Sequence, residues 1–443
     1  MRRFKLILFI SLLVLATSFL SIGVSNNSIK PAYGLSGWSG YYFVEIDNSK
    51  PGSTALTDYQ IKIVIDSSHT DFWDKVQPYA KDVRFTEEDG ETLLPYWIEK
   101  WDYANRKATI WVKVPNIPVG IKYIYMWYGN SSATGNGWHT NPDNPSTGWY
   151  AGDGDNTFIF FDDFEGVNIN TEKWKEKSWS WAEVGVGNGK LRVLILRRHF
   201  SFAGIESKQA IDEIDIVWET RYEIPSANYE DARIRLRLED VNLHGDYGIF
   251  GSNSCEYFWK VNTGVKPTLD KWMKSIQTLY SNGSKFKWET FKEDGTPELT
   301  SDIANSSVTS GSDKKIYLRC GDATPYNDYD GKMYVDYVFV RKYASKEPKI
   351  SILTSLIQGT DRREGYFEFF VNRENETWLL RIPDKGYTTG WMPFNRLRDA
   401  GSFMSGYYAD RRYHLLFDWY PSGRCHLIFN DRRQGISIKY GGR

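Results

Sequence analysis

Apolar and polar residues alternate along the first third of the chain. Residues 82–118 contain three such runs with turns between them. In residues 83–86, valine and phenylalanine alternate with arginine and threonine, which is the period of two that a half-buried strand shows. The third run, residues 108–114, ends at Pro115, because proline cannot donate a hydrogen bond to a sheet. A fourth run follows at residues 123–128, so the pattern predicts an all-β module.

The same pattern continues further along the chain. Short apolar runs bounded by turn residues recur through residues 157–352, which predicts a second β-sandwich. Residues 139–156 are dense in Gly, Pro, Asn and Asp and read as a linker, so we expect the preceding module to fold alone. Residues 361–443 form a further, unassigned β-rich module whose basic residues are nearly all arginine. The expected fold is all-β, with consecutive β-sandwiches at residues 35–138 and 157–352 and a small C-terminal module.

The first 34 residues read as a targeting segment. Basic residues at positions 2, 3 and 5 precede an apolar stretch at residues 6–24, and residues 32–34 offer a small-x-small cleavage site. This predicts export, with an extracellular or cell-surface location. The apolar run also approaches the length that spans a bilayer, so an uncleaved anchor is the alternative to a signal peptide. We expect membrane contact through this segment alone.

Composition narrows the choice of partners. The formal net charge is −1, which provides no broad basic surface for nucleic acid. Aromatic residues make up 16% of the chain, and they suit β-sandwiches and sugar-stacking surfaces alike. The three cysteines, Cys255, Cys320 and Cys425, are too few for a disulfide framework, and a Cys255–Cys320 pair is left open.

Several motifs of the first module resemble a known family. The pieces DVRFTEEDGETLLPYWIEKW, ATIWVKVPNIP and IYMWYGN, in this order, resemble the domain of unknown function 2341 of prokaryotic, often archaeal, surface proteins. The resemblance runs from Trp38 to about Ser132. That family has no agreed activity and is usually paired with a concanavalin-like sandwich. The resemblance therefore implies an architecture and does not imply an activity.

Residues 157–352 also resemble a family, the concanavalin-A-like sandwich of laminin-G-like lectins and of laminarinase-type glycoside hydrolases. The matching pieces include FFDDFEG, VGNGKLRV and MYVDYVFVRKY. In the laminarinase-type sandwich a structural calcium ion often lies on the convex face. The resemblance implies Asp163 and Gly189 as ligands through backbone carbonyl oxygens and Asp336 through its carboxylate, with waters completing six to eight oxygens. A plain surface carboxylate at Asp336 is the alternative.

The stretch at residues 213–219, EIDIVWE, invites comparison with the Glu-x-Asp-x-Glu motif of those hydrolases. A retaining glycosidase needs its two carboxyl groups about 5 Å apart. Glu213 and Glu219 are six positions apart, or roughly 20 Å along an ideal strand. The strand that matches the catalytic one lies nearer residues 233–239, which carry no such motif. We therefore expect no catalytic residues and a chain that is not an enzyme, with a divergent laminarinase-like hydrolase as an alternative.

Binding is the function that these patterns favour. Trp179 and Trp181 alternate, so both would share one face of an extended strand and could stack on sugar, with core packing as the alternative. No histidine spacing indicates a metalloprotease, and no glycine-rich loop indicates a phosphate site. We expect an exported, non-catalytic surface protein that binds carbohydrate or a surface glycoprotein through its sandwiches. A structural cell-surface spacer is the other alternative.

Overall fold

The computed structural model describes the chain from residue 35 onward in stretches, and the predicted targeting segment lies outside them. Nearly every element in these stretches is a strand, and together the strands form seven sheets, so the predicted all-β fold is confirmed. No helix among the described residues is long and apolar enough to cross a membrane. The described residues are 35–178, 182–198, 202–225, 232–239, 249–251, 256–258, 268–281, 285–304, 314–321, 329–353, 356–361, 365–372, 377–382, 387–388, 392–393, 413–419, 425–431 and 436–442.

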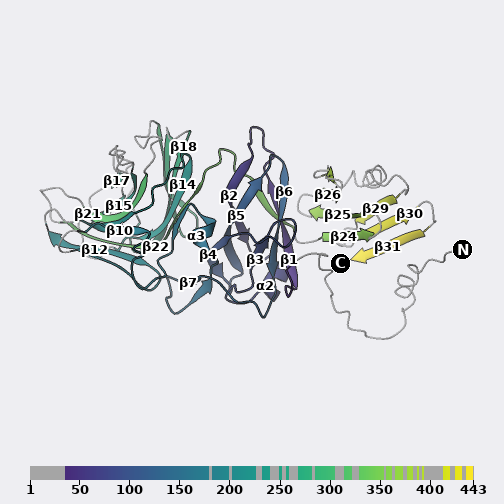
Figure 1. Ribbon diagram of the computed structural model, residues 1–443, viewed down its shortest axis with the longest axis horizontal. Helices are drawn as coiled ribbons and strands as arrows, with labels where there is room; N and C mark the ends of the chain where they lie inside the picture. The colour runs from purple at the N-terminus through teal and green to yellow at the C-terminus, as the bar shows by residue number, and fades with distance from the viewer. Residues whose placement is uncertain are drawn as a thin grey trace.

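The first sandwich packs two antiparallel sheets (Figure 1), and its third predicted run continues through Pro115 to Ile117, where the sequence pattern predicted an earlier end. Apolar residues of both sheets, among them Val44, Ile61, Ile110 and Ile124, form its core. The short helix α2 (Thr70–Lys75) adds Phe72 to the same core. One sheet has the order β23 (Lys349–Leu353), β1 (Gly40–Asp47), β6 (Ile121–Tyr128) and β3 (Arg84–Thr86), and the other has β2 (Leu56–Ile65), β5 (Lys107–Ile117) and β4 (Tyr96–Asp102).

Strand β23 reaches the first sandwich from beyond the second one. It pairs antiparallel with β1, with Phe43 opposite Leu353 and Asp47 opposite Lys349. The sequence pattern assigns residues 349–352 to the second sandwich, whereas the structure pairs them with the first. The chain therefore leaves the first sandwich, builds the second and returns.

The second sandwich consists of two large sheets. We call the one nearer the first sandwich the junction sheet and the other the distal sheet (Figure 1). Its core lies between them and includes Val193, Trp218, Leu318 and Val335. The junction sheet has the order β11 (Ala182–Val186), β12 (Leu191–Arg198), β22 (Tyr329–Lys342), β14 (Ile216–Glu223), β18 (Trp272–Tyr280), β19 (Lys285–Lys292) and β20 (Pro297–Ala304), with β9 (Phe160–Asp162) also paired to β22. The distal sheet has the order β10 (Trp174–Glu176), β13 (Phe202–Ser207), β21 (Lys315–Gly321), β15 (Ala232–Glu239), β16 (Ile249–Gly251) and β17 (Glu256–Phe258).

Residues 139–156, which read as a linker, contain a β-hairpin in the structure. Strands β7 (Trp138–Thr140) and β8 (Gly148–Tyr150) pair antiparallel, and helix α3 (Gly154–Thr157) follows. The turn-forming residues build ordered turns here, since Asp153 accepts a hydrogen bond from the backbone N–H of Asn156 at 3.0 Å. His139 is fully buried, which a solvated linker would not allow.

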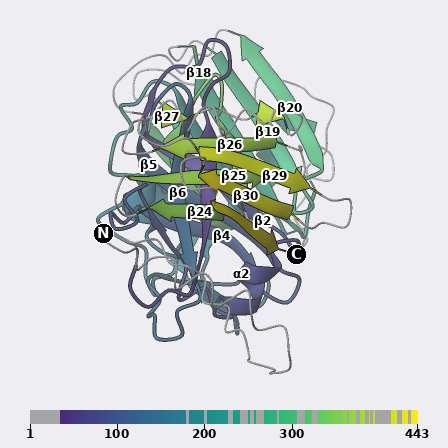
Figure 2. The same cartoon turned by 90° about the vertical axis from the view of Figure 1, so that its right-hand side faces the viewer.

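The C-terminal strands form two further sheets. Both views place them beside the first sandwich, on the side away from the second (Figures 1 and 2). They begin at residue 356, earlier than the boundary at 361 that composition suggested. One sheet contains β24 (Leu356–Asp361), β25 (Gly365–Asn372), β26 (Thr377–Ile382), β27 (Tyr387–Thr388) and β28 (Met392–Pro393), and the other has β29 (Tyr413–Trp419), β30 (Cys425–Asp431) and β31 (Ile436–Gly442).

Candidate functional site

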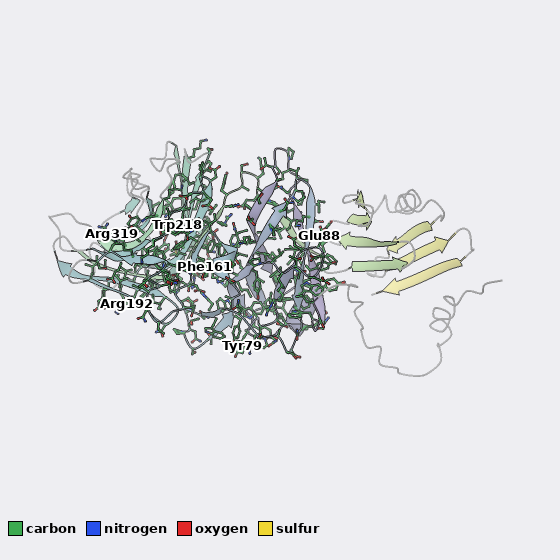
Figure 3. All side chains as sticks on the ribbon, viewed as in Figure 1. Tyr79, Glu88, Phe161, Arg192, Trp218 and Arg319 are labelled. Carbon is green, nitrogen blue, oxygen red and sulfur yellow. The ribbon has the colours of Figure 1, made fainter. Side chains whose placement is uncertain are left out.

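The two sandwiches meet over an aromatic surface. Alternation in β22 produces it: Val338 and Val340 belong to the core of the second sandwich, whereas Tyr337 and Phe339 belong to the core of the first. The ring of Tyr337 lies 5.1 Å from that of Trp97, centroid to centroid. Figure 3 shows Phe161, another ring of this cluster, between the two sandwiches. The outer face of the junction sheet is therefore covered by the first sandwich.

A buried carboxylate, that of Glu99, lies within this aromatic surface. It accepts hydrogen bonds from Trp111 Nε1 at 2.8 Å and from the Tyr337 hydroxyl at 3.0 Å, and it contacts the ammonium of Lys274. Burial alone would raise the pKa of Glu99, but the positive charges of Lys274 and Lys62 hold it well below its usual range. A carboxylate of strand β4 thus joins the two sandwiches in its ionised form.

Glu213 and Glu219, the two glutamates of the stretch that resembles the hydrolase motif, lie in different environments. Glu219, in β14, is 2% exposed and accepts a hydrogen bond from Arg341 Nε at 3.1 Å. Arg341 also bonds Glu347 at 2.9 Å. Glu213 precedes β14 and is half-buried. The structure therefore places Glu219 in the ion pairs under the first sandwich, on the covered face of the junction sheet.

A second charged cluster surrounds His139 of the hairpin. The Nδ1 atom of His139 lies 3.5 Å from a carboxylate oxygen of Asp163 and 3.6 Å from one of Glu165. Its Nε2 atom lies 3.6 Å from Asp336 Oδ1. Gly189 closes the cluster at φ +67°, where an added Cβ would meet a Glu165 oxygen at 2.7 Å. The structure therefore brings the three predicted metal ligands, Asp163, Gly189 and Asp336, to one place around a histidine that the sequence analysis missed.

Two basic side chains, Arg221 and His139, contact the carboxylates of this cluster. Burial lowers the pKa of His139, but the carboxylates of Asp163, Asp336 and Glu165 outweigh it, so the pKa is raised overall. Burial raises the pKa of Asp336, although His139 and Arg221 act against this. Arg221 donates to Asp336 Oδ2 at 2.8 Å and to Glu293 at 2.8 Å. Arg221 therefore bonds one oxygen of the buried Asp336 carboxylate, and the imidazole of His139 lies beside the other.

The fit of this cluster to calcium can be tested on its atoms. Calcium needs six to eight oxygens at about 2.3–2.6 Å. The imidazole of His139 stands between Asp163 and Asp336, because its Nδ1 faces Asp163 and Glu165 and its Nε2 faces Asp336. No group of three or more His, Cys, Asp or Glu side chains among the described residues is arranged to hold a metal ion. As placed, these residues fit a histidine side chain between the carboxylates and do not enclose a calcium ion.

The outer face of the distal sheet carries a second polar group of residues. Glu206 of β13 lies 2.9 Å from the ammonium of Lys177 and 3.3 Å from that of Lys315. Burial raises the pKa of Glu206, but hydrogen bonds from Lys177 and Tyr317 bring it below its usual value. Tyr317 stands directly opposite Glu206 on the neighbouring strand β21. This face therefore combines hydrogen-bonding groups with an aromatic ring.

Two sequence-based candidates lie elsewhere. Trp179 and Trp181 fall in residues 179–181, between β10 and β11, and are outside the described residues. Cys320 of β21 is buried in the core of the second sandwich as a free thiol, whereas Cys255 lies outside the described residues. Sugar stacking by the two tryptophans therefore stays a prediction.

The sequence contains weak signals for some of the charged residues that were not predicted. Glu99 is a carboxylate within the apolar run Tyr96–Trp101, where alternation alone does not explain it. Arg221 lies on a strand of otherwise buried residues. His139 had no local signal, because its neighbours are turn formers and its burial depends on residues far along the chain.

A family model matches part of the chain. Residues 79–177 match the domain of unknown function DUF2341, which supports the resemblance drawn from the strand motifs. The match begins in the first sandwich and ends with the first strands of the second. The match includes the whole hairpin with His139, and it also includes Glu99 and Asp163. The matched region therefore contributes residues to both charged clusters, the one at Glu99 and the one at His139. No curated protein matches the chain.

Solved structures of similar architecture include carbohydrate-active enzymes. A glycosyl hydrolase family protein from Mycobacterium fortuitum is 15% identical, with a TM-score of 0.31, and the match covers 41% of this chain and 99% of that one. An endo-beta-1,3-glucanase from Pyrococcus furiosus is 17% identical, with a TM-score of 0.29, over 43% of this chain and 95% of that one. A sialidase is 13% identical, with a TM-score of 0.31, over 52% of this chain and 20% of that one.

These findings correct the prediction that the chain is not an enzyme. The similar structures are those of glycosyl hydrolases and a glucanase, so hydrolysis of a sugar polymer is an activity that has to be measured. At identities of 17% or less and TM-scores near 0.3, the similarity assigns no catalytic residue to this chain.

Proposed function

We propose that this chain is an exported surface protein that binds carbohydrate on the outer face of its distal sheet. One observation carries the proposal: the first sandwich covers the junction sheet through Tyr337 and Phe339, which leaves the distal sheet as the other outer face. On that face Tyr317 stands beside Glu206, with Lys177 and Lys315 in contact with the carboxylate. An aromatic ring flanked by hydrogen-bonding groups suits a sugar, which offers an apolar face and a rim of hydroxyls.

The carbohydrate can be free or carried by a surface glycoprotein, and the chemistry of the face is the same for both. Trp179 and Trp181 follow β10, the edge strand of this sheet, in the chain. We propose that they extend the binding face by stacking on sugar. Export rests on the first 34 residues, whose charge and apolar pattern support it.

The test is binding of the full chain to a panel of polysaccharides, with release of reducing sugar measured on the same samples. We expect Tyr317→Ala to weaken binding at least tenfold at an unchanged melting temperature. Tyr79→Ala serves as the matched control, because Tyr79 is 53% exposed on the first sandwich (Figure 3). Binding that is absent from the whole panel, or equal in both variants, would refute the proposal. Sugar release would show that the bound polymer is also cleaved.

A further inference from the structure

Arginine positions repeat along the central strand of the distal sheet. In β15, arginines occupy positions 233, 235 and 237, and apolar residues occupy 234, 236 and 238. Because strand positions alternate between faces, the three arginine positions share one face. They recur about every 6.8 Å along the strand. The pattern places a row of arginine positions along one face of the sheet.

The neighbouring strand identifies which face this is. In β21, Ile316 and Leu318 are buried in the core, so Tyr317 and Arg319 belong to the outer face. The register sets Arg235 opposite Arg319 and Arg237 opposite Tyr317. Directly opposite residues share a face of the sheet. The arginine row therefore lies on the same outer face as Glu206 and Tyr317, and Figure 3 shows Arg319 on the side of the molecule far from the first sandwich.

The rows across this face hold more basic than acidic positions, although Glu239 follows the arginine positions on the same face of β15, opposite Lys315. One row runs Lys175, Glu206, Tyr317 and Arg237 across four neighbouring strands. The carboxylate of Glu206 is already in contact with Lys177 and Lys315. In the next row, Arg319 faces Arg235 on one side and Gly204, which has no side chain, on the other.

Two like charges directly opposite on adjacent strands destabilise a sheet. The register sets arginine positions 235 and 319 directly opposite each other, and a ligand that carries negative charge along this row would offset repulsion between them. The formal net charge of the whole chain is −1, so the basic excess belongs to this face and not to the protein at large.

We propose that the distal face binds an acidic polysaccharide, one that carries carboxylate or sulfate groups along its length. This inference rests on the proposed function and names its ligand class. Guanidinium groups bind carboxylate and sulfate oxygens in a forked geometry, which a lysine ammonium cannot reproduce. Repeated arginine positions match a polymer that presents negative charge at intervals. The ring of Tyr317 provides a surface for an apolar face of the sugar.

The test compares polymers that differ in charge. The full chain is titrated with polygalacturonate for carboxylate, dextran sulfate for sulfate, and dextran and laminarin as neutral polymers, each at low and high salt. We expect at least tenfold tighter binding to one or both acidic polymers at low salt, with affinity falling as salt rises. The acidic polymer that binds more tightly identifies the preferred group.

Variants locate the site. We expect Arg235→Gln with Arg237→Gln to weaken acidic binding at least tenfold, and Arg235→Lys to recover only part of it. Arg192→Gln is the control, because Arg192 is half-exposed on the junction sheet of the same sandwich. Loss of binding without a change in melting temperature supports the inference, and equal loss in the control variant overturns it.

The outcomes separate the two proposals. Binding to neutral polymers alone would overturn the acidic-ligand inference and leave the proposed function standing. Binding to no polysaccharide would overturn both. Binding to single-stranded RNA as tight as that to the acidic polymers would show a general affinity for polyanions and would also overturn the inference. A double variant that no longer folds would be replaced by Arg319→Gln, for which we expect the same loss.

Discussion

The hydroxyl of Tyr337 donates to Glu99 Oε1 at 3.0 Å across 238 residues of chain. Tyr337 lies on the last strand of the second sandwich, and Glu99 lies on β4, an edge strand of the first. The same carboxylate contacts Lys274, from a third strand of the junction. Several donors bond the one carboxylate of Glu99 in this buried network. Breaking any of these contacts would leave a buried polar group without a partner, so the network favours a single geometry. The two sandwiches are therefore held in one arrangement.

Loss of the Glu99 carboxylate should weaken the fold strongly. The side chain of Lys274 is 20% exposed, and in Glu99→Ala its ammonium loses its nearest counter-charge. Removing one partner of a buried ion pair costs about 3–5 kcal/mol, so we expect a drop of that size in the free energy of unfolding. Urea denaturation measures it. Glu91→Ala, at an exposed position of the first sandwich, should change the free energy by less than about 0.5 kcal/mol.

A double variant isolates the pair. In Glu99→Gln with Lys274→Met, neither charge remains, so we expect the double variant to regain much of the stability that Glu99→Ala loses. If Glu99→Ala cost less than about 1 kcal/mol, the carboxylate would not be holding the junction together.

The ionised state of Glu99 also predicts an acid response. Its folded pKa lies below its ordinary value, despite burial, because of Lys274 and Lys62. The group therefore contributes stability that is complete above the unfolded pKa of about 4.3 and is lost as pH falls toward the folded pKa. We expect the melting temperature of the wild type to fall steeply below about pH 4. The double variant, which cannot titrate here, should fall less; parallel curves would contradict this assignment.

The sequence predicted the strands well because their pattern is local. Residues 108–114, for example, lie within β5, where the apolar positions face the core as alternation requires. The grouping of Asp163, Gly189 and Asp336 followed from a family resemblance, not from any local pattern. His139 and β23 escaped prediction, because burial in a turn-rich segment and pairing across about three hundred residues depend on contacts that only the folded chain forms.

His139 should be important for stability. In His139→Ala, Asp336 keeps only Arg221 as a counter-charge while it is 2% exposed, and the pKa of Asp336 would rise further. We expect a loss of about 3 kcal/mol in the free energy of unfolding, measured by urea denaturation at neutral pH. Asp143→Asn removes an exposed partner of Arg221 in the same cluster and should cost less than about 1 kcal/mol. Equal effects of the two variants would show that the burial of His139 does not matter.

Calcium binding at Asp163, Gly189 and Asp336 is a separate prediction of the sequence, and a thermal melt tests it. Because the imidazole of His139 stands between the two carboxylates, we expect the melting temperature of the full chain to be unchanged by calcium or EDTA. An ion that bound the folded state would add about 2.7 kcal/mol at a hundredfold excess over Kd. A calcium-dependent rise in the wild type that disappears in Asp336→Ala would show that the ion binds there after His139 turns away.

The return of β23 predicts how fragments behave. The sequence predicts that residues 36–138 fold alone, but this fragment lacks the strand that pairs with β1. Its backbone groups from Phe43 to Asp47 would then stand at a sheet edge, and exposed edges promote association between chains. We therefore expect the fragment 35–138 to associate or precipitate, whereas 35–353, which keeps β23, should elute as a single species in size-exclusion chromatography. A control fragment, 35–348, keeps the second sandwich and lacks only β23. It should associate as 35–138 does, and a stable monomer of 35–348 would show that β1 does not need this partner.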